Sequence, residues 1–569
     1  MTSLNPRIDD VREHGAAHEL TRGTLIAAAL AVCLAQVALA IPAVLNGLFQ
    51  QDLGTSSSQL TWISDAFLVP VTLLELSFGA LGDLFGRKRL LVGGALLLGA
   101  GELIAVLTPG ASASTGTRVL VLWTGQIIAG IGAAAIFPTS LAMVAAGTHT
   151  AGHRARSIAI WAAALSAGGF VSPVLGGLVT KIKWGSDPYA SWRWGFIAVL
   201  ILALISAAVS MVLARDSSAP AGRSLDWPGQ VTIAVALFAL LFAVIQGPTS
   251  GWSSGQVIGG FIVAAIFLVL FVLAENRSAA PLLRLSLFTN RAFAVASIVT
   301  VMAMFSFLGT AYATSIRLSA IQGFTPLRTS IAFVLLNGMA LVQMPVTSRV
   351  LARYNPKWAL GGGAVLIGAG DLWMSRIPAA NLSIPPIIVP LVLIGIGFGF
   401  AVSALTAVAV NTVPNHLEGM ASGSTSMLRD FGFTLGPAVI GAIALSQAAA
   451  EMQSKIAASP ALRHALALFN AAPAHAPAAQ KPALEAAVGA VNSGPLGANA
   501  VPGTITLPSG KTAPFNPLKD VAFHALDHAY SLGYVVVGIC ALAAGALALL
   551  GLGGHGDDPL INQESLAEE

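Results

Sequence analysis

The chain has 569 residues, of which 55% are hydrophobic and only 9% are charged, and its mean hydropathy is +0.79. Soluble domains carry roughly 25% charged residues, so this composition excludes a soluble globular protein and indicates an integral membrane protein. The formal net charge of +4 is spread through short loops, which excludes nucleic acid as a partner, and Cys33 and Cys540 lie in separate apolar runs, which excludes a disulfide framework or metal cluster.

The apolar runs predict an all-α integral membrane fold with about fourteen membrane-spanning helices. A helix needs roughly 20 apolar residues to cross the hydrocarbon core of a bilayer, and each run is close to or beyond that length. The predicted spans are residues 23–48, 60–82, 90–108, 118–146, 157–181, 192–214, 227–247, 255–274, 292–316, 328–352, 358–376, 385–412, 421–446 and 528–552.

The charges of the connecting segments predict the orientation of these spans. With the N-terminus inside, sixteen Lys and Arg residues lie in cytoplasmic segments and seven in short external segments. Basic residues accumulate on the cytoplasmic side, so we expect both termini to be cytoplasmic and the chain to lie in the plasma (bacterial inner) membrane. The segment 447–527 then lies outside. Its Ala, Pro and Gly content predicts a mostly flexible loop with room for a short surface helix, and an inert linker is favoured over a lid across the exit path.

A charged reversal of the chain joins the second and third predicted spans. Its pattern is G-x-L-x-D-x-x-G-R-K-R, and the positions of interest are Gly79, Gly82, Asp83, Gly86, Arg87, Lys88 and Arg89. The glycines let backbones approach and turn, and the basic residues hold the turn at the cytoplasmic surface. The pattern resembles the signature loop of the major facilitator superfamily of secondary transporters. An ordinary basic loop would explain the charges, but not the spaced glycines and the aspartate.

The fifth and thirteenth spans share a pattern of small residues around a proline. The residues are Gly168, Ser172, Pro173, Gly176 and Gly177 in the fifth span and Gly432, Gly436 and Pro437 in the thirteenth. Small residues four apart let helices pack closely, and the presence of the pattern in both halves indicates an internal duplication. The first copy resembles the antiporter motif G-x-x-x-G-P-x-x-G-G of drug exporters, with Ser172 in place of a glycine. Generic packing of glycine-rich spans is the plainer alternative.

Two tryptophan segments narrow the resemblance. Residues 62–67 are similar to the W-x-x-D-x-Y segment of quaternary-ammonium and multidrug efflux pumps, with Phe67 in place of the tyrosine, and residues 192–194 match their W-R-W segment. With fourteen spans, the chain is similar to the fourteen-helix drug:proton antiporter family, which implies two six-helix bundles and two extra central helices. The expected regions are a cytoplasmic tail (1–22), an N-terminal bundle (23–214), two linker helices (227–274), a C-terminal bundle (292–552) with the external loop 447–527, and a second cytoplasmic tail (553–569).

Acidic residues inside the spans are candidates for carrying a proton. A carboxyl group enclosed in a helix bundle can exchange a proton near neutral pH, and the candidates are Asp65, Glu75 and Glu102. The alternative for each is a structural acid that hydrogen-bonds a neighbouring helix. Asp371 stands about one and a half turns before Arg376, and a structural ion pair is favoured there.

Arg429 is the basic residue predicted to lie deepest in the membrane, and Asp430 follows it. The stretch resembles the R-x-x-G segment of helix 13 in the drug:proton antiporter family. Adjacent helix residues point in different directions, so Asp430 need not neutralise Arg429. An unpaired charge is unfavourable in the membrane, so Arg429 either reaches the cytoplasmic boundary or meets an acid or a carbonyl group on another helix. A gate or structural role is favoured over contact with substrate.

The chain departs from the family at two positions linked to proton coupling. The family has an aspartate in helix 1, whereas residues 31–42 contain no carboxylate, and Gln126 stands where helix 4 of the family carries an arginine. Glutamine can still form hydrogen bonds, but it has no charge with which to shift the pKa of a nearby acid. We therefore expect Asp65 or the two glutamates to carry proton coupling without the usual network.

Polar, aromatic and methionine side chains in the inner spans are expected at the wall of a substrate cavity, because they suit variable hydrophobic ligands. These residues are Gln126, Trp161, Phe305, Phe307, Asn337, Met339, Gln343, Met344 and Asn411. For any single one of them, packing against lipid or another helix is the plainer explanation. The surplus of buried acids over one deep arginine favours neutral or cationic amphipathic ligands.

The sequence predicts a proton-coupled antiporter that exports hydrophobic or cationic amphipathic compounds, driven by the proton gradient, without a cofactor or metal, and working as a monomer. A dedicated exporter of one natural product or lipid, and a non-transporting sensor on the same scaffold, remain alternatives. An enzyme is not expected, because the sequence lacks a zinc-protease motif, a nucleophile elbow and a phosphate-binding loop.

Overall fold

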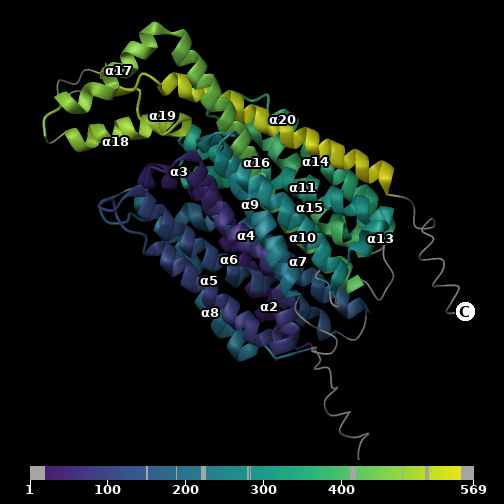
Figure 1. Cartoon of the computed structure of the whole chain (residues 1–569). Coiled ribbons are helices and arrows are strands. Elements are labelled where there is room, and N and C mark those ends of the chain that lie inside the picture. Colours follow the sequence, from purple (N-terminus) through teal and green to yellow (C-terminus); the bar gives the residue numbers. More distant parts are fainter. Residues whose placement is uncertain are drawn as a thin grey trace, which may run out of the picture.

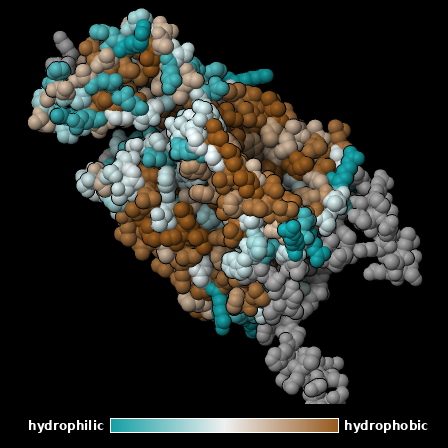
Figure 2. All heavy atoms as spheres, viewed as in Figure 1, coloured by the Kyte–Doolittle hydropathy of each residue, from teal (hydrophilic) through white to brown (hydrophobic). Residues whose placement is uncertain are grey.

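The computed structural model is a long bundle of membrane-spanning helices with a smaller group of helices at one end (Figure 1). Residues 20–148, 151–187, 189–218, 226–278, 281, 283–410, 418–478, 480–506 and 512–552 are described below. A broad hydrophobic belt covers the visible face of the bundle, and hydrophilic residues gather at its two ends (Figure 2). This distribution is the one expected of a protein that crosses a bilayer.

The first span of the N-terminal half, Arg22–Leu53, is interrupted at one residue. The elements of this half are α2 (Arg22–Ala40), α3 (Pro42–Leu53), α4 (Ser57–Phe85), α5 (Arg87–Val106), α6 (Thr115–Ala146), α7 (Ala151–Val179), η1 (Tyr189–Trp192) and α8 (Arg193–Leu213). The single span predicted for residues 23–48 divides at Ile41, because Pro42 has no N–H with which to continue the helical hydrogen bonds. Ser56 and Gln59 form a capping box that begins α4, and Gly86, with φ of 101°, ends it.

Two further membrane helices connect the halves, and the C-terminal half follows them. The connecting elements are α9 (Trp227–Ser250), α10 (Gly255–Arg277) and η2 (Leu285–Thr289). The C-terminal half contains α11 (Arg291–Ser315), the π-helix η3 (Ile316–Ile321), α12 (Pro326–Val342), α13 (Met344–Arg353), α14 (Pro356–Met374), α15 (Pro385–Val410), α16 (Glu418–Ala458) and α20 (Lys519–Gly551).

Eleven of the described helices are long and apolar enough to cross a membrane, and thirteen are if each of two bent pairs forms one span. The bends are 55° within α4, beyond Glu75, and 45° between α12 and α13. The remaining predicted span, 358–376, is the 19-residue helix α14, whose apolar character is diluted by glycines, Lys357 and Asp371. The prediction of an all-α membrane fold is confirmed.

The segment 447–527 differs from the flexible loop that its composition predicts. After α16 it folds into α17 (Pro460–His475), α18 (Lys481–Asn492), α19 (Pro495–Ala500) and a hairpin of β1 (Thr504–Thr506) and β2 (Thr512–Pro514). We call the described residues between 460 and 514 the cap, and Figure 1 shows it at one end of the bundle beside α3. Phe469 and Val491 pack with Met452 of α16 and Leu518 in a small buried cluster, which gives the cap a hydrophobic core.

The cap is fastened to the bundle through α19. Leu496 is 1% exposed and belongs to the main buried cluster of the bundle. The Asn499 side-chain amide donates hydrogen bonds to the carbonyl groups of Ala320 (3.1 Å) and Ile321 (3.2 Å) in η3. These contacts fix the cap over the end of the bundle where α3 and η3 meet.

Candidate functional site

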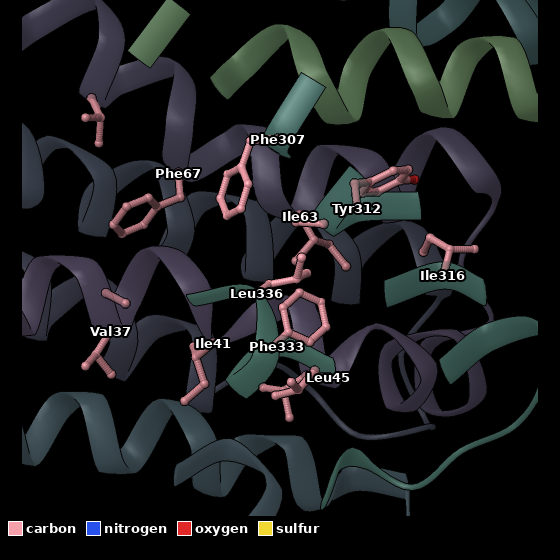
Figure 3. Close-up of a cluster of buried hydrophobic side chains, with 14 of the residues drawn as sticks. Val37, Ile41, Leu45, Ile63, Phe67, Phe307, Tyr312, Ile316, Phe333 and Leu336 are labelled. Carbon is pink, nitrogen blue, oxygen red and sulfur yellow. The ribbon is translucent and has the colours of Figure 1, made fainter. Parts of the chain in front are cut away.

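The two halves meet along two seams, one between α4 and α16 and the other between α7 and α12. Between the seams, near the cap, buried apolar side chains from both halves interdigitate. The members labelled in Figure 3, which we call the seam cluster, are Val37, Ile41, Leu45, Ile63, Phe67, Phe307, Tyr312, Ile316, Phe333 and Leu336. They come from α2, α3, α4, α11, η3 and α12, so the cluster closes the space between the halves on the side of the cap.

Hydrogen bonds cross between the halves beside this cluster. The Asn46 amide on α3 donates to Ser315 Oγ on α11 at 2.8 Å, and Ser315 in turn donates to the carbonyl group of Ala43. The hydroxyls of Thr61 on α4 and Tyr312 on α11 are 2.8 Å apart. Because the four side chains that make these bonds are buried, separating the halves here exposes or orphans polar atoms that are paired in this conformation.

A level of buried polar side chains lies inside the N-terminal half. Helices α4 and α6 run parallel, because Trp62 contacts the ring of Trp123 and the Phe67 backbone packs on Gly130. Asp65 and Gln126 lie between these two contacts, at the same depth along the bundle. Gly101 of α5 packs on Gly125 and Ala129 of α6, which brings Glu102 to the same height.

The three side chains of this level are unusual in their burial. Asp65, Glu102 and Gln126 are each 0% exposed. Their carboxylate and amide atoms have no hydrogen-bond partner among the described residues. A carboxyl group enclosed without a donor is more stable uncharged than charged, so the level can hold protons in this conformation.

Glu75, the third predicted acid, lies instead at the seam between α4 and α16. Its Oε1 is 3.8 Å from Arg429 Nη2, and Arg429 also donates to both carboxylate oxygens of Asp430, at 2.7 and 3.0 Å. Asp430 therefore does pair with Arg429, because the flexible arginine side chain folds back onto its neighbour. The expected acid on another helix is also present, so Arg429 joins the two halves as part of a three-residue charge cluster.

Asp371 lies in the C-terminal half and does not pair with Arg376 as expected. Its Oδ1 accepts a hydrogen bond of 2.6 Å from Thr310 on α11, and it is 0% exposed. Arg317 directly follows the predicted span 292–316, so the sequence predicts it in a short external segment. It is 2% exposed and donates to the carbonyl groups of Met374 and Ile377 at the end of α14. The π-helical turn η3 carries Arg317 inward, and the apolar residues around it give no sign of that turn.

The signature loop is braced within the N-terminal half. Arg87 donates to Asp83 Oδ1 at 3.0 and 2.7 Å, and it also reaches the carbonyl group of Ala142 at 3.3 Å. The backbone N–H of Lys88 donates to Asp216 at 3.0 Å. Asp83 and Arg87 are buried, although Lys88 and Arg89 continue the basic run. Gly79 and Gly82 lie against Pro138 and Thr139 of α6.

The antiporter-like motif places α7 between α2 and α12. On one face, Gly168 lies against the carbonyl group of Cys33, and Ser172 Oγ donates to the carbonyl group of Val37 at 2.9 Å. A Cβ atom on Gly176 would be 2.8 Å from Val44 Cγ2, so a larger residue there would push α3 away. On the other face, Gly177 lies against Leu327 of α12. Ser172 thus adds a hydrogen bond where the family pattern has glycine, beside Pro173.

The glycines of α16 repeat this arrangement in the C-terminal half. Gly432 lies against Val301 and Met304 of α11, and Gly436 lies against Gly309, one residue before Pro437. The helix α16 therefore packs on α11 as α7 packs on α2, and each also forms one of the two seams. The internal duplication indicated by the sequence is visible in this pairing.

Several of the predicted cavity residues make specific contacts inside the bundle. Met339 and Gln343 pack on α15, where Gln343 donates to the carbonyl group of Ile396 at 2.7 Å. Trp161 donates to Ser140 of α6 at 3.0 Å, and Phe307 stacks on Phe398 with ring centroids 3.6 Å apart.

The other candidates are placed as follows. Asn337 lies against Gly169 at the seam between α7 and α12, and Phe305 and Met344 are half-buried. Asn411 lies outside the described residues. Packing therefore accounts for Met339 and Gln343, while Phe307 and Asn337 lie where the halves meet.

Comparison with known proteins gives a consistent result. A family model described as Major Facilitator Superfamily matches residues 26–437. The chain is 31% identical to the multidrug resistance protein Stp of Mycobacterium tuberculosis, over 74% of this chain and 75% of that protein. It is 27% identical to the tetracenomycin C resistance and export protein of Streptomyces glaucescens, over 92% and 90%. In fold it resembles a bacterial homologue of the lysosomal transporter Spinster, with a TM-score of 0.58, 14% identity and coverage of 93% and 96%.

Proposed function

Because this chain belongs to the Major Facilitator Superfamily, and is a membrane transporter of the efflux type rather than an enzyme, we propose that it exports neutral or cationic amphipathic compounds in exchange for protons. The energy source is the proton gradient, and no cofactor takes part. The transporter works as a monomer in the plasma membrane, with both termini in the cytoplasm and the cap outside.

The observation that carries the proton-coupled part of this proposal is the enclosed level of Asp65, Glu102 and Gln126. These three buried side chains have no hydrogen-bond partner among the residues that the structure describes, which lowers the stability of the fold, because each enclosed polar group loses its hydration without a replacement bond. Buried ionisable residues in membrane helices are typical of proton pathways. The level therefore supports proton binding in a chain without the helix 1 aspartate and the helix 4 arginine that the resemblance to the drug:proton antiporter family implies.

Asp65 is the member of this level best placed to couple proton binding to movement of the halves. It lies on α4, which forms a seam, one helical turn after Thr61, whose hydroxyl is 2.8 Å from that of Tyr312 in the other half. Glu102 lies on α5, which packs on α6 and α8 within its own half. When the halves separate on the cap side, the surroundings of Asp65 change first, so Asp65 gains access to external protons in that state.

Alternating access follows from the contacts between the two halves. In this conformation the seam cluster and the hydrogen bonds of α3 with α11 close the side that carries the cap. Rocking of one half against the other opens that side and closes the opposite one, where the signature loop lies. Substrate leaves on the cap side. A proton then binds Asp65, and the reverse movement carries this proton to the opposite side.

A dedicated exporter of one natural product is a second candidate. It is favoured by the similarity to a relative named for resistance to and export of tetracenomycin C, which spans nearly the whole chain. The transport cycle would be the same, and the two candidates differ in the range of compounds moved.

The proposal is tested by measuring proton movement in proteoliposomes that contain the purified protein and an internal pH-sensitive dye. Addition of a cationic amphipathic dye, a neutral amphipath or tetracenomycin C is expected to start proton flux with at least one of these compounds. A substrate range of several compounds supports the multidrug exporter, and flux with one compound supports the dedicated exporter. Substrate movement that leaves the internal pH unchanged would contradict proton exchange.

A further inference from the structure

A groove lies on the outside of the bundle, away from the seam cluster. It is bounded by α4, α6, α9 and α16 and is closed at one end by the link between α18 and α19, with a volume of about 940 Å³. Figure 1 shows α9 beside α4 and α16. Pockets for small ligands typically measure roughly 300–1,000 Å³, so the groove can hold a molecule of that size.

The lining changes in character from one end of the groove to the other. Near the cap it presents the amides of Gln59, Gln246 and Gln453, and deeper it presents the rings of Trp62, Trp123 and Phe238. The ring centroid of Trp62 lies 6.3 Å from that of Trp123 and 5.9 Å from that of Phe238, so the three rings form one continuous surface. None of the described lining residues is Asp, Glu, Lys, Arg or His.

The position of the groove relates it to one leaflet of the bilayer. Along α4 the lining runs from Gln59 to Pro70, which corresponds to roughly 16 Å of helix. That is about half of the roughly 30 Å hydrocarbon core. Ile127 and Phe238 are 43% and 51% exposed, so the groove opens sideways to lipid and not into the path between the halves.

We propose that this groove binds a single-chain amphipathic lipid with an uncharged polar head, taken from the leaflet on the side of the cap. The glutamine amides match a hydroxyl-bearing head that both donates and accepts hydrogen bonds. A charged head would meet no opposite charge there, and the aromatic surface contacts the chain. Because α9 and α16 both line the groove, the bound lipid fills the space between the connecting helices and the seam of α4 with α16. Binding of this lipid requires that the protein spans a bilayer, but it does not require that the protein exports a substrate.

The test uses a monoacylglycerol whose chain carries a diazirine, incorporated in nanodiscs with the full-length protein and activated by light. Mass spectrometry of the peptides is expected to place adducts near Trp62 and Phe238. Ala449→Trp fills the groove with a ring and is expected to lower this labelling at least about fivefold. Ala450→Trp adds the same ring at the next, exposed position outside the groove and is expected to leave labelling within about twofold.

A second variant covers the case in which Ala449→Trp does not fold. Phe238→Ala removes a half-exposed ring from the groove, so the core of the protein is preserved while labelling of the α4 peptide falls. Adducts spread evenly over the exposed apolar face of α8, at Ile201 and Leu204, would overturn the proposal. So would equal losses in the two tryptophan variants, or equal labelling by a probe with the same chain and a trimethylammonium head.

Discussion

Replacing Asn46 by alanine is expected to weaken closure of the transporter on the side of the cap. The Asn46 amide makes one buried hydrogen bond between the halves, to Ser315 Oγ at 2.8 Å. A buried hydrogen bond between uncharged groups contributes about 0.5–1.5 kcal/mol, which changes the ratio of closed to open protein roughly 2- to 13-fold. Ser315 still donates to the carbonyl group of Ala43, so the lower part of this range is expected.

The assay measures how fast a cysteine at position 319 reacts with a membrane-impermeant maleimide, in a protein that lacks Cys33 and Cys540. Ser319 is 2% exposed and lies against Gly47 of α3 across the two halves, so it reacts only when the halves separate there. Asn46→Ala is expected to raise this rate by the factor given above. Asn470→Ala, which truncates the same type of side chain at an exposed position in the cap, is expected to leave it unchanged. Equal rates in both variants and in the parent would refute the assignment of Asn46 to closure.

Three other substitutions test separate parts of the molecule. Asp83→Asn removes the negative charge that pairs with Arg87, far from the seam cluster, so transport in proteoliposomes should fall while ligand affinity changes by less than about threefold. Parallel loss of both would show that Asp83 acts on binding. A cysteine introduced at position 480 should react with an external, impermeant maleimide in whole cells if the proposed topology, with the cap outside, holds; reaction only after permeabilisation would reverse the topology. Asn499→Ala leaves two carbonyl groups of η3 without their donor, so hydrogen exchange in residues 495–500 should become faster, and unchanged exchange would show that the cap is held by other contacts.

Features that depend on local spacing could be predicted from the sequence. The small residues of α7 and α16 contact α2 and α11 because a repeat of four positions puts them on one helix face, whichever helix lies opposite. Gly86 has a positive φ at the end of α4, which the reversal of the chain requires. Such patterns are predictable because they depend only on the geometry of one helix or one turn.

Features that depend on the register between helices could not be predicted. The common height of Asp65, Glu102 and Gln126 follows from how α5 and α6 pack through Gly101 and Gly125, and no pattern along a single helix records it. The cap was missed for a related reason. Its core joins Phe469 and Val491 to residues of α16 and to Leu518, and each of these segments is too weakly apolar by itself to indicate a folded unit.

The central claim, that Asp65 carries the exchanged proton, is tested most directly by comparing Asp65→Asn with Glu75→Gln. In proteoliposomes with an imposed pH gradient, we expect Asp65→Asn to bind substrate and to move it down its own gradient, but no longer to respond to the pH gradient. Glu75→Gln should keep the response, because Glu75 is already engaged with Arg429. Uphill export by Asp65→Asn with a normal pH profile would contradict the account, and loss of the response in Glu75→Gln alone would move proton exchange to the charge cluster at the seam.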